Sequence, residues 1–172
     1  MTLAGAATGV AFAAAGAGLH GLWPDATLPL AIGLGAVALV YAGHEAGLIE
    51  LPVPGRDWQV PATWVRDGFY RSAVVFGGAV GFGVFTRIPY ASFPILLAWL
   101  VVAGNVWYGL AAGLIYGSMR ALSIYLGSSR GDVSQLVELN HTLMAAIPAI
   151  HQVTGLALAA FAAYLLVAPL LS

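Results

Sequence analysis

The chain has 172 residues, of which 60% are apolar and 8% charged, and its mean hydropathy is +0.90. Soluble domains average about 45–50% apolar and about 25% charged residues. So little charge cannot keep a soluble surface hydrated, which excludes a soluble globular enzyme, a nucleic-acid-binding domain and a disordered chain. A polytopic membrane protein remains, with the lipid bilayer as its expected surroundings, and the net charge of -1 indicates no particular partner.

The chain contains no cysteine. A disulfide, a thiolate metal site and a cysteine redox relay are therefore impossible within it. The apolar segment 1–22 lacks the basic n-region and the cleavage pattern of a signal peptide. We therefore expect this segment to be a retained membrane span.

Apolar stretches recur at about the 20 residues that a helix needs to cross a hydrocarbon core of about 30 Å. They predict an all-α transmembrane bundle, a single integral domain over residues 1–172 in the prokaryotic inner membrane. The stretch 88–126 would measure about 58 Å as one helix, so we divide it at Gly104–Asn105 into a short span and a full one. Five spans are the alternative, if this stretch crosses once. The six expected spans are about 3–22, 28–49, 68–86, 89–104, 106–126 and 141–171, the last bent at Pro148.

Several of the 22 glycines repeat at four-residue intervals, a spacing that lets helix backbones approach closely in lipid. The pattern suits packing within the bundle, which we favour, and also a dimer face, which leaves a homo-oligomer open. The rows are Gly5–Gly9, Gly43–Gly47, Gly77–Gly81 and Gly109–Gly113–Gly117.

A candidate site lies where the glycine-rich stretch 76–83 runs into Thr86, Arg87 and Pro89. Proline removes a backbone donor and breaks a helix, and a broken span exposes backbone groups to protein, water or substrate. Arg87 at such a break would bind an anion or pair with a carboxylate. The alternative is an interfacial loop in which Arg87 only sets topology.

The dipeptide His44–Glu45 lies near the end of the second expected span. Ionisable residues at the membrane are candidates for a functional site, so these two are possible partners of the break at 86–89. One turn from the span end, they also fit an interfacial polar cap.

The four histidines suggest an alternative, a haem b or another tetrapyrrole held between pairs of histidines. His141 and His151 are separated by about 15 Å of helical rise, so the two cannot ligate one metal. Each would need a histidine from another helix, either His20 or His44. No metal cluster, nucleophile elbow or phosphate loop is visible, so we expect no metal site and do not favour an enzyme.

Two segments, in order, resemble the cytochrome c biogenesis transmembrane family, which includes CcdA and the membrane domain of DsbD. Residues 41–54 are similar to its Gly-His-x-x-Gly-(Leu/Ile)-x-x-Leu-Pro pattern, and residues 75–89 to its Gly-Phe-Gly-rich helix running into Thr-Pro-Cys. Thr86 matches the threonine, whereas Arg87, Ile88 and Pro89 replace the Pro-Cys. The resemblance covers about residues 38–127.

The resemblance implies a shared fold and broken-helix device, but not the family's thiol relay, because both membrane cysteines are missing. We therefore expect a non-enzymatic, transporter-like or accessory membrane component, with no bound cofactor and with Thr86, Arg87, Pro89, His44 and Glu45 at its substrate site. The alternative is a structural or haem- or pigment-binding subunit associated with other membrane protein subunits.

Overall fold

The computed structural model describes residues 1–52, 74–75, 77–78, 81, 90–128 and 133–170. The regular structure of these residues is helical, as expected. The main helices are α1 (Thr2–Leu22), α2 (Thr27–Glu45), α4 (Ser92–Ala103), α5 (Val106–Ser128) and α6 (Val133–Val167), with short 3-10 turns at Pro24–Ala26 and Ala168–Leu170.

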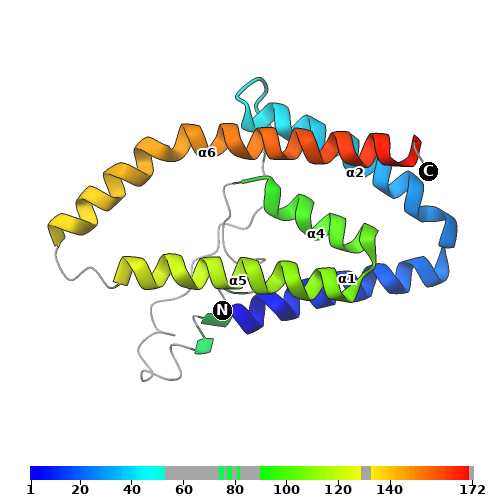
Figure 1. Cartoon of the computed structure of the whole chain (residues 1–172), viewed down its shortest axis with the longest axis horizontal. Helices are drawn as coiled ribbons and strands as arrows, with labels where there is room; N and C mark the ends of the chain where they lie inside the picture. Colours follow the sequence, from blue (N-terminus) through cyan, green and yellow to red (C-terminus); the bar gives the residue numbers. More distant parts are fainter. Residues whose placement is uncertain (53–73, 76, 79–80, 82–89, 129–132, 171–172) are drawn as a thin grey trace.

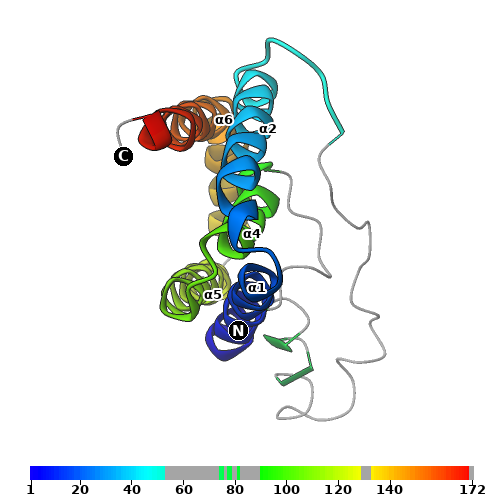
Figure 2. The ribbon, with the colours of Figure 1, turned by 90° about the vertical axis from the view of Figure 1, so that its right-hand side faces the viewer.

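The helices form two antiparallel pairs with a short helix between them. Figure 1 shows α1 beside α5 along one edge of the molecule and α2 beside α6 along the other. Helix α4 lies between the pairs and contacts both α1 and α2, as the view in Figure 2 also shows. The buried apolar core is built where α2, α4 and α6 meet, from Leu34, Ala38, Ala42, Ala91, Ile95, Leu158, Ala162 and Leu165.

Helix α2 ends four residues earlier than the expected span 28–49, for a reason visible in its backbone. Gly47 has φ +75°, the left-handed conformation that glycine adopts without a steric penalty. The Gly47 amide donates to the His44 carbonyl and the Leu48 amide to the Gly43 carbonyl, both at 2.9 Å. This is the Schellman arrangement, which closes a helix by using its last carbonyls. It places Glu45 at the last residue of α2.

The expected turn at Gly104–Asn105 is confirmed. Gly104 ends α4 with φ +58°, and the Asn105 side-chain oxygen accepts the amide of Trp107 at 2.9 Å, which caps the start of α5. The expected short span 89–104 needs correction, because α4 has 12 residues and rises only about 18 Å, too little to cross the membrane.

Helix α6 also differs from its expected range, 141–171. It begins at Val133, has 35 residues and keeps Pro148 inside it. Figure 1 shows α6 curving in its N-terminal half, and a proline inside a helix is a usual cause of bending. The N-terminal part of α6 extends beyond the C-terminal end of α2 (Figure 1).

Three helices of the described chain are long and apolar enough to cross a membrane: Thr2–Leu22, Pro24–Glu45 and Val137–Val167. That is fewer than the six spans expected, and the expected span 68–86 lies almost wholly outside the described residues. Large apolar side chains remain exposed on α2 and α6, including Ile32, Leu39, Val153 and Leu156. Such faces need an apolar environment, and together with the three helices they indicate a membrane protein.

The glycine rows of α1 and α5 pack against each other within the chain. A Cβ atom added at Gly9 would collide with the Gly109 carbonyl, and one at Gly5 would lie 2.5 Å from the Gly113 carbonyl oxygen. These rows therefore let the two backbones touch. Gly43–Gly47 is not a packing row, because Gly47 forms the turn that ends α2.

Candidate functional site

A buried carboxylate lies where α2, α4 and α6 converge. Glu45 is only 3% exposed, and its side chain is fully enclosed. An isolated charge is costly to bury and needs partners. Glu45 is the last residue of α2 and directly precedes the Schellman turn that ends the helix.

The first partner of Glu45 is the N-terminus of α4. The Ala91 amide donates to Oε1 of Glu45 at 2.8 Å, and Ala91 itself is fully buried. The first amides of a helix have no partner within it and form the positive end of the helix dipole. A carboxylate from α2 therefore caps α4 across 46 positions of sequence.

The second partner is His151 of α6. Its Nδ1 lies 2.5 Å from Oε2 of Glu45, and because an ionised carboxylate only accepts, Nδ1 is the donor. The His151 side chain is 33% exposed, whereas that of Glu45 is 0% exposed. The ring of Tyr90, just before α4, lies 5.0 Å from the His151 ring. Solvent therefore reaches the pair at His151 and not at Glu45.

A glycine allows α6 to come this close to α2. A Cβ atom at Gly155 would lie 3.2 Å from the Ala42 carbonyl oxygen and 3.4 Å from Cβ of Glu45. Gly155 is one helical turn after His151, so the close approach at this position brings the imidazole to the carboxylate. Sequence reasoning assigned His151 only to cofactor binding and did not pair it with Glu45.

The side chain of His44, expected beside Glu45 in the substrate site, is bonded to the segment that follows α2. The Leu51 amide donates to its Nδ1 at 3.1 Å, and its ring stands edge-on to Tyr41. The Tyr41 hydroxyl in turn donates to the Pro52 carbonyl at 3.0 Å. Both side chains therefore fix the segment after α2, and the site keeps Glu45 but not His44.

The other two histidines lie away from this pair. His20 of α1 packs against Gly104, where an added Cβ would be 2.6 Å from its Nδ1, and its buried Nε2 has no hydrogen-bond partner. His141 is exposed on α6. Among the described residues, no hydrogen bond or ring contact joins two histidines, so the histidine pairs that the haem alternative requires are not seen there.

The residues expected at the helix break, Thr86, Arg87 and Pro89, lie outside the described part of the chain. The structure begins again at Tyr90, directly before the α4 N-terminus that Glu45 caps.

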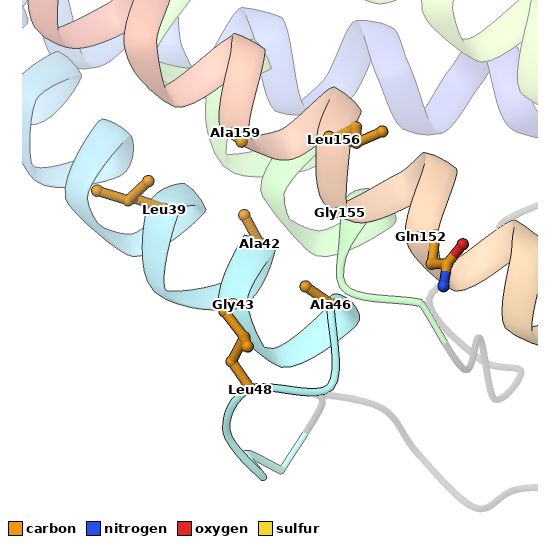
Figure 3. Close-up of a pocket in the computed structure, with 9 residues that line it drawn as sticks. All are labelled: Leu39, Ala42, Gly43, Ala46, Leu48, Gln152, Gly155, Leu156 and Ala159. Carbon is orange, nitrogen blue, oxygen red and sulfur yellow. The ribbon is translucent and has the colours of Figure 1, made fainter.

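An apolar groove of about 490 Å³ lies beside the pair, between α2 and α6. Figure 3 shows the residues along its two walls, with Gln152 the only polar side chain among them. Gly155 lines the groove and also contacts the backbone near Glu45, but neither Glu45 nor His151 lines it. The groove is therefore a neighbour of the polar site and adds no charged group to it.

Comparison with known proteins does not assign the chain: no family model matches it, and neither curated proteins nor solved structures give a match. The functional argument therefore depends on the site itself.

Proposed function

We propose that the protein is a small transporter-like component of the prokaryotic inner membrane, with α4 as its moving element. The observation that carries the proposal is the buried carboxylate of Glu45 capping a half-length helix inside a membrane bundle. In many transporters, broken helices end at the substrate site near the middle of the membrane. The site comprises Glu45, His151 and the α4 N-terminus, with Thr86, Arg87 and Pro89 in the segment leading to it.

The proposal agrees with the resemblance to the cytochrome c biogenesis family, because both include a helix that is broken within the membrane. The proposal includes the five-span alternative, in which 68–86 is a further span and the stretch 88–126 crosses the membrane once. It also includes either independent action or service as an accessory to other membrane subunits. It excludes a thiol relay, because the chain has no cysteine. On this proposal, Arg87→Ala abolishes transport but leaves the protein folded.

The absence of cysteine gives a test that needs no knowledge of the solute. A single cysteine is placed at Ser92, the first residue of α4, and labelled with a membrane-impermeant maleimide in right-side-out and inside-out vesicles. Alternating access predicts labelling from both sides. A cysteine at Asp25, in the turn between α1 and α2, is the control and should react from one side. Labelling of Ser92→Cys from one side only would contradict a transporting role.

One observation favours a second candidate function, a tetrapyrrole-binding subunit. A carboxylate on Nδ1 of a histidine fixes the ring and presents Nε2, as in many metal-ligating histidines, and Glu45 holds His151 in this way. Such a group would supply redox or light-absorbing chemistry when bound at His151. An absorption spectrum tests this: a Soret band in the purified protein should vanish in His151→Ala and persist in His141→Ala. A colourless preparation made with haem supplied would reject this function.

A further inference from the structure

We infer that the apolar groove between α2 and α6 binds one acyl chain of a bilayer phospholipid, and that the Gln152 side chain donates a hydrogen bond to the ester carbonyl of that chain. The inference concerns the groove alone and does not depend on the proposed function. It gives the groove a ligand of defined chemistry, a hydrocarbon chain with one hydrogen-bond acceptor at its end.

The lining of the groove is apolar except for one amide. Alanine, glycine and leucine residues of both helices form its walls, and Gln152 is the only polar side chain among the described residues that line it. Leu48 and Leu156 of this lining are 80% and 72% exposed, so the groove opens onto an apolar surface. Its volume of about 490 Å³ falls within the range of about 300–1,000 Å³ that is usual for small-molecule sites. An uncharged, largely apolar ligand therefore matches the groove.

The groove lies at the end of a membrane span, where the hydrocarbon core meets the ester groups of the lipids. The span that contains α2 ends at Glu45. A Cβ atom added at Gly155 would lie 3.3 Å from the Ala46 amide nitrogen, so Gly155 is level with this end. Since α6 runs antiparallel to α2, Gln152 lies on the head-group side of Gly155 and Ala159 on the hydrocarbon side, as Figure 3 shows along the α6 wall.

The dimensions of the groove suit a hydrocarbon chain better than a helix of a second copy. From Gln152 to Ala159 the α6 wall rises about 10 Å, two thirds of the share of one leaflet, about 15 Å, in a hydrocarbon core of about 30 Å. Spread over this length, 490 Å³ corresponds to a mean cross-section of about 50 Å², whereas a helix about 10 Å wide needs about 80 Å². Carbon atoms in contact are about 4 Å apart, so an extended acyl chain is narrow enough to enter.

The Gln152 amide has a free donor for the polar end of the ligand. No hydrogen bond joins its side chain to another residue that the structure describes. A polar group without a partner is costly at the edge of the hydrocarbon core. The amide NH₂ of glutamine can donate to a carbonyl oxygen, and an ester carbonyl lies at the upper end of every acyl chain of a phospholipid. The chain would then extend from Gln152 towards Ala159.

The test measures phospholipid retained by the full-length protein in detergent, by native mass spectrometry with phosphatidylcholine as the probe. We expect one phosphatidylcholine to remain bound per protein. Gly43→Leu, whose side chain extends into the groove, should abolish this one-to-one adduct. Gly33→Leu, on the same helix with open space around its Cβ, should keep it. No adduct in the parent protein, or equal adducts in the two variants, would overturn the inference.

A second measurement tests the hydrogen bond of Gln152. Phosphatidylcholine with ether-linked chains of the same length lacks the ester carbonyls, so the parent protein should bind the ester lipid about fivefold more tightly, the value of one hydrogen bond of about 1 kcal/mol. This preference should disappear in Gln152→Leu and persist in Asn140→Leu, a like change at an exposed amide of α6. Equal binding of the two lipids by the parent protein would overturn the role of Gln152. A dimer that Gly43→Leu dissociates, without any lipid adduct, would show instead that a second copy fills the groove.

Discussion

The two helix pairs of this protein are built by different means. Helices α1 and α5 meet through glycine backbones, as at Gly9 and Gly109. Helices α2 and α6 meet through larger apolar side chains such as Leu34 and Leu158 and through the polar contact of Glu45 with His151. In the first pair the two backbones are in direct contact. The second pair leaves a groove and contains a buried charge.

This difference indicates a division of roles. In lipid, where apolar surfaces gain little by associating, close backbone packing of small residues is an effective way to hold two helices together. Buried ionisable groups are costly in the membrane and usually serve a function. We therefore interpret α1–α5 as the rigid half of the protein and the junction of α2, α4 and α6 as its working half.

The largest loss of stability is expected when a side chain is inserted between α1 and α5. Gly9→Val places Cβ against the Gly109 carbonyl, and because backbone cannot move aside, we expect a loss of about 3 kcal/mol in unfolding free energy. The measurement is denaturation by SDS followed by circular dichroism. Gly18→Val is the matched control on the same helix, since nothing lies within 4 Å of its added Cβ. Equal stability of the two variants would show that α1–α5 is not the rigid half.

A smaller effect is expected from removing the carboxylate in the other pair. Glu45→Ala leaves the Ala91 amide and His151 without their acceptor, and an unsatisfied buried donor costs about 1–3 kcal/mol. Glu45→Gln keeps an acceptor oxygen for the Ala91 amide and should lose less stability. The same denaturation assay compares the two variants. If Glu45→Gln is as unstable as Glu45→Ala, the negative charge rather than the cap of α4 holds the junction.

The interaction free energy between Glu45 and His151 should be smaller than the loss of stability caused by Glu45→Ala. A double-mutant cycle of Glu45→Gln and His151→Asn should give an interaction free energy of about 1 kcal/mol, because polar contacts in membrane proteins are modest. Additive effects of the two substitutions would mean that the 2.5 Å contact contributes nothing to folding.

The smallest effect is expected in the groove between α2 and α6. An added Cβ at Gly43 comes no closer than 3.6 Å to Ile49, so Gly43→Leu extends into the groove and should change stability by less than about 0.5 kcal/mol. Gly33→Leu, on the same helix with open space around its Cβ, provides the comparison. A large loss in Gly43→Leu alone would show that α2–α6 is packed as tightly as α1–α5.

Local sequence signals determined the elements of this fold. Runs of apolar residues predicted the helical membrane class, and α1 matches its expected range within one residue. Gly104 and Asn105 predicted the turn between α4 and α5, because glycine permits a positive φ and asparagine caps the next helix. Gly47 also indicates the end of α2, because glycine permits a positive φ. The apolar residues after it led instead to an expected span that continues to residue 49.

Only the tertiary structure decided how the polar residues are used. The sequence marked Glu45 and His151 as ionisable residues in apolar surroundings, but 106 positions separate them. Their contact depends on the end of α2 at the Gly47 turn, on the approach of α6 at Gly155 and on the start of α4 at Ala91. Hydropathy and spacing describe one helix at a time, whereas a buried charge must find its partners on other helices. For that reason His44, adjacent to Glu45 in sequence, lies outside the site, and distant His151 lies within it.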